Sequence, residues 1–435
     1  MTRWAAVSPI PPPGRLRTLA FATLANTVGS GLWLAGAALF LTRDVGLSPA
    51  SVGAGLTVAG LIGLTASVPL GGLADRHDPR TLRAVLQLLQ AAVAASYLLV
   101  DSFPVFLVVA VLDALLVSGN LSVRAALVAA VGGPDGRVHA FATLRAVANL
   151  GIAVGAGSAG FALAADTHAA YQVLVVGNAA TYLFSAALIL RLPACPPAAS
   201  GRTADSPVPR RGRALRDGPF LAVSAASAML SVHYVVLTLI VPLWVAARTE
   251  APAAVVSAVL LANTVLTVLL AVRMSRGADT ALPASRAMRR AGLVLAGAMV
   301  LYAATAGTPT GPAIGLLLLA TAVYTIGDLW HGSAGAGLAY DLAEPEAIGA
   351  YQGVDGLLSG IARAVGPALL TWVILDGGVV GWAAVGLLFA ITGLLAPPLT
   401  RWALTTRGRP TRIPDIGPIA TADGTDRQKH RRSSV

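Results

Sequence analysis

The segment GGLADRHDPRTLR, residues 71–83, places a cluster of charges between two long apolar runs. The runs on either side, residues 50–73 and 82–101, are each long enough to cross the ~30 Å hydrocarbon core of a bilayer as a helix. The same alternation of apolar runs and short polar connections recurs along nearly the whole chain. Residues 71–83 therefore indicate the connecting loop of a helical hairpin in a polytopic membrane protein.

The composition of the chain agrees with this interpretation. Of its 435 residues, 56% are hydrophobic and 12% are charged, whereas a soluble protein carries about 25% charged residues. The net charge of +11 comes from arginines in loops and tails that form no recognition helix, so we expect no nucleic-acid partner. Cys195 is the only cysteine, which excludes a disulfide or a cysteine metal site within the chain, and we predict no metal site.

Apolar runs bounded by charges, prolines and glycines predict twelve transmembrane helices. The first six cover residues 17–42, 50–73, 82–101, 104–130, 140–165 and 170–191, and the last six cover residues 219–247, 252–272, 291–308, 312–339, 354–375 and 379–399. A polar, proline-rich linker, 193–218, separates a first bundle, 17–192, from a second bundle, 219–400. Residues 1–16 form an N-terminal segment, and residues 401–435 form a basic tail that we expect to be disordered. The predicted fold class is an all-α polytopic membrane protein with two pseudo-symmetric six-helix halves.

The placement of arginines predicts the orientation in the membrane. Arg76, Arg80 and Arg137, together with the arginines of the linker and the tail, fall on one side, whereas the other side keeps only Arg43 and Arg248. Cytoplasmic loops carry the excess of basic residues, so both termini are expected in the cytoplasm. We expect a multi-pass protein of the inner or plasma membrane, and the arginine- and alanine-rich composition favours a bacterial source.

An internal repeat supports the division into halves. AVANLGIAVGAGSAG, residues 146–160, aligns with LLSGIARAVGPALLT, residues 357–371, so that Gly155 falls on Gly366 at an offset of 211 residues. This is the register that a duplicated six-helix unit requires.

The loop at residues 71–83 resembles that between the second and third helices of the major facilitator superfamily. Gly71, the pair Asp75-Arg76, and Arg80 occupy positions of that family's motif, whereas Asp78 and Pro79 stand where the family has a glycine and its first basic residue. The twelve spans, the central linker and the repeat extend the resemblance to the whole chain. The resemblance implies two rocking halves that expose a central site alternately to each side of the membrane.

A second resemblance is to the drug–proton antiporters of that superfamily. NLGIAVGAGSAG, residues 149–160, is similar to their glycine-rich motif in the fifth helix, with Ala156 in place of a proline. Close helix packing is an alternative explanation for these glycines. In the fourth helix, Asp113 stands near the position where antiporters carry an arginine.

The loop motif predicts a gate on the cytoplasmic side. The N-terminus of a helix attracts a carboxylate, and the resemblance implies that Asp75 meets the start of helix eleven, which carries Asp355. The acidic loop 341–349 could bind Arg76 and Arg80 when this gate is shut, or it could be ordinary solvated charge. Near the inner ends of helices four and five, two further gate candidates are Arg124 and Arg145.

Ionisable residues inside the predicted spans are candidates for proton coupling. Asp113 and Asp328 lie near mid-membrane, where a charge costs about 2.5–3.5 kcal/mol on insertion scales. Desolvation favours the neutral form of a carboxyl group, so each could load and release a proton. His331 shares a helix face with Asp328, and Arg363 could be a counter-ion for Asp328 or for an anionic substrate. His233, in the middle of helix seven, is either a further proton carrier or an internally hydrogen-bonded residue.

Four uncharged polar residues could line a substrate cavity or hold helices together. They are Asn26, Asn149, Asn178 and Asn263.

These features predict a secondary active transporter, most simply a proton-coupled exporter of a small, fairly apolar drug or metabolite. An importer or facilitator of a polar nutrient, or a non-transporting sensor on the same fold, is the alternative. The sequence contains no HExxH, Gly-x-Ser-x-Gly or P-loop motif, so we expect no enzyme and no cofactor, with a proton gradient as the driving force. The expected partners are a small-molecule substrate and the lipid bilayer, around a monomer.

Overall fold

The computed structural model describes residues 11, 13–165, 167–197, 213–252 and 254–407, and all regular structure in this part of the chain is helical. Most of the predicted linker, residues 198–212, lies outside the described residues. The same holds for residues 408–435 of the predicted tail and for residues 1–10 and 12 of the N-terminal segment.

The first half contains six long helical segments. They are α1 (Arg15–Leu39) with the π-helical turn η1 (Phe40–Asp44); α2 (Pro49–Gly63), η2 (Leu64–Ala66) and α3 (Ser67–Ala74) in one continuous span; α4 (Pro79–Ser96) with η3 (Tyr97–Leu99); α5 (Phe103–Ala165), in which two helices meet at Gly133; and α6 (His168–Leu190). Gly133 has φ 65°, a left-handed conformation that glycine adopts without steric cost.

The second half repeats this arrangement. Its elements are η5 (Ala214–Arg216); α7 (Gly218–Ser231), α8 (His233–Val235), η6 (Val236–Ile240) and α9 (Val241–Arg248) in one span; α10 (Ala254–Met274); α11 (Ala281–Ala303); α12 (Thr310–Asp341); η7 (Pro345–Ala347) and α13 (Ile348–Leu370) with the π-helical segment η8 (Thr371–Asp376); and α14 (Gly378–Thr406).

Eleven helices in the described residues are long and apolar enough to cross a membrane, and α11 completes the predicted twelve. The sequence predicts the ninth helix at 291–308, but α11 begins ten residues earlier, at Ala281. Its first turns carry three arginines, which lower its hydropathy and hide it from a pattern based on apolar runs. At the other end of the chain, α14 continues to Thr406 and includes residues 401–406, which the sequence assigns to the tail.

The two residues that depart from the family's loop motif, Asp78 and Pro79, form the start of α4. The Asp78 carboxylate accepts a hydrogen bond from the Arg80 amide (2.9 Å), and Pro79 is the first helical residue. Aspartate at the N-cap and proline at the next position are both favourable at a helix N-terminus. Asp78 and Pro79 therefore stabilise the beginning of α4 in place of the glycine and basic residue of the family pattern.

The glycine-rich segment of helix five packs against helix one. A Cβ atom at Gly155 would overlap the carbonyl oxygen of Val28, so α1 and the second helix of α5 approach each other through their backbones. Close packing of this kind is how small residues join helices in membranes. The contact between Gly155 and Val28 fixes the position of the second helix of α5, which carries Arg145.

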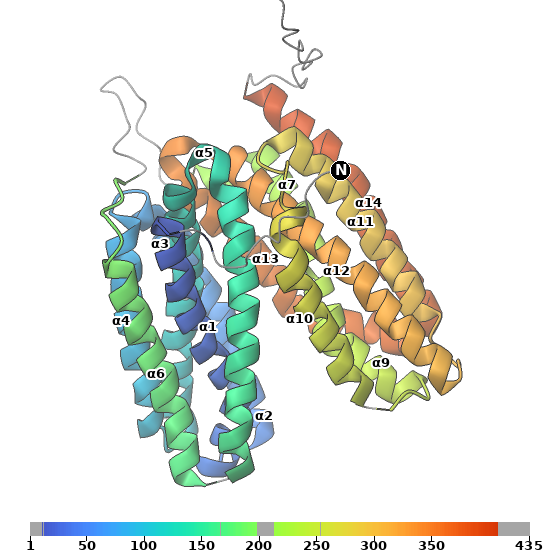
Figure 1. Ribbon diagram of the computed structural model, residues 1–435, viewed down its shortest axis with the longest axis horizontal. Coiled ribbons are helices and arrows are strands. Elements are labelled where there is room, and N and C mark those ends of the chain that lie inside the picture. The colour runs from blue at the N-terminus through green and yellow to red at the C-terminus, as the bar shows by residue number, and fades with distance from the viewer. Residues whose placement is uncertain (1–10, 12, 166, 198–212, 253, 408–435) are drawn as a thin grey trace, which may run out of the picture.

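The two sets of helices lie side by side, with α1–α6 on the left of Figure 1 and α7–α14 on the right. They converge at the end of the molecule where α3 contacts α13, and they diverge toward the opposite end (Figure 1). We call the end that carries Asp75 and Gly349 the gate end. The π-helical segments η1 and η8 end the spans that begin with α1 and α13, and η6 lies within the span that begins with α7.

Candidate site at the interface between the halves

An ion pair joins the two halves inside the membrane region. The Arg145 guanidinium on α5 donates to both carboxylate oxygens of Asp328 on α12, each at 2.6 Å, and also to the Asp328 carbonyl oxygen at 3.3 Å. Only 16% of the Arg145 side chain and 5% of the Asp328 side chain are exposed. Arg145 also lies over the ring of Tyr234, 5.7 Å from its centroid. The pair is therefore a buried, charge-assisted link between residues 183 positions apart in the chain.

A chain of buried polar side chains adjoins this ion pair. His233 Nε2 lies 3.6 Å from Asp328 Oδ1 and 3.0 Å from His331 Nδ1. On its other side, His233 Nδ1 is 2.7 Å from the Tyr324 hydroxyl. His331 Nε2 reaches the Ser227 carbonyl oxygen at 3.1 Å. All five side chains, those of Ser227, His233, Tyr324, Asp328 and His331, are buried.

The Ser227 carbonyl fixes the direction of these hydrogen bonds when both rings are neutral. A carbonyl oxygen only accepts, so His331 carries its hydrogen on Nε2 and accepts at Nδ1. His233 then donates from Nε2 to His331. The Tyr324 hydroxyl, which has one hydrogen, lies 2.7 Å from His233 Nδ1 and 3.1 Å from the His233 carbonyl oxygen, both of which are acceptors. The order of donation therefore runs from His233 through His331 to the backbone of α7.

The structure changes two of the predicted pairings. Arg145, which the sequence groups with the gate and Asp75, binds Asp328 instead. Arg363, considered as a counter-ion for Asp328, donates from Nε to the Ser359 carbonyl oxygen of its own helix (3.2 Å). His331, predicted to share a helix face with Asp328, meets it through His233 in between.

Asp113 belongs to a different part of the molecule. It lies half-buried on the first helix of α5 and interacts electrostatically with Tyr97 and Tyr182 of the same half. The two candidate acids, Asp113 and Asp328, are therefore not brought together.

The four asparagines are dispersed. Asn26 accepts a hydrogen bond from Gln87 (3.2 Å), and Asn263 donates to Thr325 (3.0 Å), one turn from Asp328. Asn178 is buried on α6, and Asn149 is half-buried on α5.

The gate end is closed by the Asp75 carboxylate. It accepts hydrogen bonds from the backbone amides of Gly349 (2.6 Å) and Ala350 (2.9 Å) in the first turn of α13. Gly71, one turn earlier, contacts the Gly349 backbone so closely that a Cβ atom there would overlap the Gly349 carbonyl oxygen. A carboxylate at a helix N-terminus and a glycine contact thus hold α3 against α13. Asp355, predicted at the start of this helix, lies two turns farther in and hydrogen-bonds Ser224.

The acidic loop 341–349 does not bind Arg76 or Arg80 through the contacts described for it. Glu344 pairs with Arg213 (3.0 Å), and Asp341 accepts a hydrogen bond from the Ala281 amide (2.8 Å). Arg80 binds the Leu192 carbonyl oxygen (2.7 Å), and Arg76 is exposed. Arg124 interacts electrostatically with Arg83 and Tyr340.

The gate should respond to pH through Asp75. Burial raises the pKa of Asp75 from its ordinary value of 3.8 to about 6, although its two amide hydrogen bonds and Arg76 act in the opposite direction. Once the gate opens, water surrounds the carboxyl group and its pKa returns toward 3.8. The proton therefore binds more tightly to the closed gate, so closure is favoured as the pH falls through about 6 and loses this contribution as the pH rises through that value.

Distances between spin labels at the gate measure this response. With His77→Cys and Glu346→Cys labelled in a Cys195→Ala background, the closed population should grow between about pH 7.5 and about pH 5. Asp75→Asn should remove that change. A pH response of the same size in Asp75→Asn would assign it to another group.

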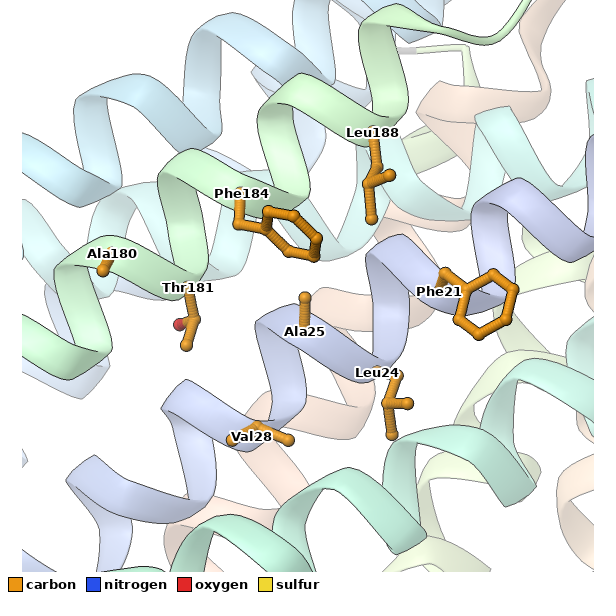
Figure 2. A pocket seen from close by; sticks show the side chains of 8 residues that line it. All are labelled: Phe21, Leu24, Ala25, Val28, Ala180, Thr181, Phe184 and Leu188. Carbon is orange, nitrogen blue, oxygen red and sulfur yellow. The ribbon is translucent and has the colours of Figure 1, made fainter.

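The structure also has an apolar groove of about 530 Å³ between α1 and α6. Figure 2 shows its lining, which is apolar apart from the Thr181 hydroxyl. Phe21 and Phe184, which line it, are 41% and 60% exposed, so the groove opens on the outer surface of the bundle. It is separate from the polar chain around Asp328.

Comparison with known proteins gives the family. The model of the Major Facilitator Superfamily matches residues 19–367, which is most of the chain. The chain belongs to the major facilitator superfamily. It is accordingly a polytopic membrane protein with the transporter fold of that superfamily.

Solved transporter structures share this major facilitator fold. The human organic anion transporter MFSD10 (TETRAN) has a TM-score of 0.64 at 18% identity, with 89% of this chain and 100% of that chain covered. A point variant of the E. coli fucose:proton symporter FucP has a TM-score of 0.67 at 14% identity, with 88% and 98% covered. A point variant of the nucleoside transporter NupG has a TM-score of 0.55 at 15% identity, with 90% and 99% covered. No curated protein matches the chain.

Three residues of the interface between the halves are not predicted by the sequence. Tyr324 and Tyr234, which flank His233, resemble ordinary aromatic residues of apolar spans, and Ser227 contributes a backbone carbonyl that no pattern marks. The usable signal is spacing, because Tyr324 lies one helical turn before Asp328 and therefore on the same face.

Proposed function

We propose that the chain is a secondary active transporter of the cell membrane that exports a small, fairly apolar compound in exchange for protons. The gate end faces the cytoplasm in this proposal. The observation that carries it is the buried ion pair between Arg145 and Asp328, because its two members belong to the two halves that move in alternating access.

The Asp328 carboxylate can be neutralised in two ways, by the Arg145 guanidinium or by a proton. With the gate end closed, Arg145 holds Asp328 in its ionised form. A proton that arrives from the side opposite the gate end neutralises Asp328 and releases Arg145, so the halves can then separate at the gate end and the proton leaves toward the cytoplasm. Proton binding and the contact between the halves therefore exclude each other, which is the condition for coupling a conformational change to a proton.

The histidine chain supports a role in proton transfer. His233 lies 3.6 Å from Asp328, and a protonated His233 that passes its Nε2 hydrogen to His331 Nδ1 becomes neutral and leaves the positive charge on His331, beside α7. Histidine changes its charge near physiological pH more readily than other side chains, which suits such a relay.

The direction and the substrate class rest on the sequence. The segment 149–160 resembles the fifth-helix motif of drug–proton antiporters, and its Gly155 packs against α1. The chain is 6% aromatic, whereas sugar sites usually offer more aromatic and amide side chains. Both features favour export of an apolar compound over uptake of a sugar.

Flux through proteoliposomes tests the proposal. With candidate apolar compounds, transport against the substrate gradient should require a pH gradient and should stop when a protonophore collapses it. Proton movement measured with an internal pH dye should accompany substrate in the opposite direction. Uphill transport that persists without a pH gradient would refute proton coupling, and movement of substrate and proton in the same direction would refute exchange.

A further inference from the structure

A second group of buried charges lies inside the first half, separate from the pair of Arg145 and Asp328. Arg83 on α4 is only 1% exposed, and its Nε and Nη1 atoms have no hydrogen-bond partner among the described residues. Arg124 on α5 is half-buried and interacts electrostatically with Arg83. Two cations therefore come close to each other within a membrane-embedded bundle.

Polar side chains place these arginines on facing surfaces. Asn120 on α5 donates to Gln90 on α4 (2.7 Å), and Gln87 on α4 donates to Asn26 on α1 (3.2 Å). Arg83 is one turn before Gln87, and Arg124 is one turn after Asn120, so both arginines extend this polar surface toward the gate end. The Oε1 atom of Gln87 and the Oδ1 atom of Asn120 are also buried without a partner in the described part of the chain.

None of the salt bridges among the described residues includes either arginine. A guanidinium cannot shed its proton in a protein, and a buried charge is tolerated only when it is paired. We propose that Arg83 and Arg124 bind a small inorganic anion such as chloride between α4 and α5. The two guanidinium groups supply the charge, and Nε and Nη1 of Arg83 are available as donors.

The opposite half covers this anion site. The Tyr340 hydroxyl on α12 donates to the Ala125 carbonyl oxygen (3.1 Å), next to Arg124, and Tyr340 is 3% exposed. Tyr340 reaches this position only when α12 lies against α5 at the gate end. The anion therefore enters and leaves while the gate end is open and is retained while it is closed. This site goes beyond proton-coupled export, because it holds whether or not Asp328 carries a proton.

Thermal unfolding of the full chain in phosphatidylcholine nanodiscs tests the anion site. Sodium gluconate is replaced stepwise by sodium chloride at constant ionic strength, and the wild-type Tm should rise to a plateau. Arg83→Gln should show no rise of Tm with chloride. In gluconate its Tm should exceed that of the wild type, because the variant has lost an uncompensated buried charge. Arg124→Gln should raise the half-saturating chloride concentration by about tenfold or more, since one charge-assisted interaction is lost.

Two further variants separate binding from general effects of charge. Arg83→Lys, which keeps the positive charge, should retain part of the rise, and Arg191→Gln, at an exposed position at the end of α6, should retain all of it. A wild-type Tm that is the same in chloride, nitrate and gluconate would refute the site, as would an unchanged rise in Arg83→Gln. A rise that requires phosphatidylglycerol and not chloride would identify a lipid phosphate and would also overturn the assignment to a dissolved anion.

Discussion

Asp328→Asn is expected to abolish proton-driven transport. Asparagine cannot carry the exchangeable charge, and its introduction leaves Arg145 buried without a counter-ion. Removing one partner of a buried ion pair costs about 3–5 kcal/mol, so the equilibrium between the two conformations should shift by on the order of a hundredfold or more. Uphill transport in proteoliposomes measures the loss, and Asp101→Asn, the same substitution at an exposed position, should leave transport unchanged.

The double variant Arg145→Gln/Asp328→Asn separates the two roles of Asp328. With both charges gone, this contact holds no buried ion, and the association of the halves should recover more than the two single effects predict. Downhill flux should return, whereas transport against the substrate gradient should not, because no group at this position takes up a proton. Uphill transport in the double variant, or in Asp328→Asn alone, would show that the proton is carried elsewhere, and Asp113 would be the next residue to test.

The second large effect is expected for Gly71→Val. The new side chain would enter the space of the Gly349 backbone, so α3 and α13 could not approach to the distance that the Asp75 hydrogen bonds require. Inserting atoms into a close-packed contact costs roughly 1–3 kcal/mol, so transport should fall by about fivefold or more. The distance between labels at residues 77 and 346 should increase, because the variant favours the open gate.

Gly72→Val provides a matched control for this prediction. Gly72 belongs to the same helix, but a Cβ atom there would meet nothing within 4 Å. Both variants exchange a glycine for valine in the same turn, so they share the effect on helix propensity. If Gly72→Val reduces transport as strongly as Gly71→Val, the loss comes from the helix itself and the contact with Gly349 is not the cause.

The sequence predicts the fold well because the bilayer imposes a strong constraint. An apolar run of about 20 residues has few alternatives to a spanning helix, and basic loops mark one side. The largest error concerns α11, whose first turns contain Arg286, Arg289 and Arg290. A helix can begin several residues before its apolar run, and hydropathy does not detect first turns that are polar.

The site is predicted less completely because its contacts join distant parts of the chain. The cost of a charge in hydrocarbon identifies Asp328 as unusual, but it does not reveal which of several arginines approaches it. Depth in the sequence favours Arg363 over Arg145, which lies near the inner end of helix five, and only the packing of α5 against α1 and α12 brings Arg145 to Asp328. The gate contact of Asp75 is different, since a family motif there implies its partner helix.

The π-helical segments make the two ends of the molecule mechanically unlike. At the gate end, the regular helices α3 and α13 contact each other through the Asp75 hydrogen bonds and the close approach of Gly71 to Gly349. Such a contact is either formed or broken. Away from the gate end, η1 and η8 replace the regular hydrogen-bond ladder at the ends of two helices and η6 interrupts it within a third, and such interruptions are where helices kink. We therefore expect closure of the opposite end to proceed by bending within helices instead of docking between them. In alternating access, we therefore expect the two gates to work by different kinds of motion, although a sequence repeat relates the two halves.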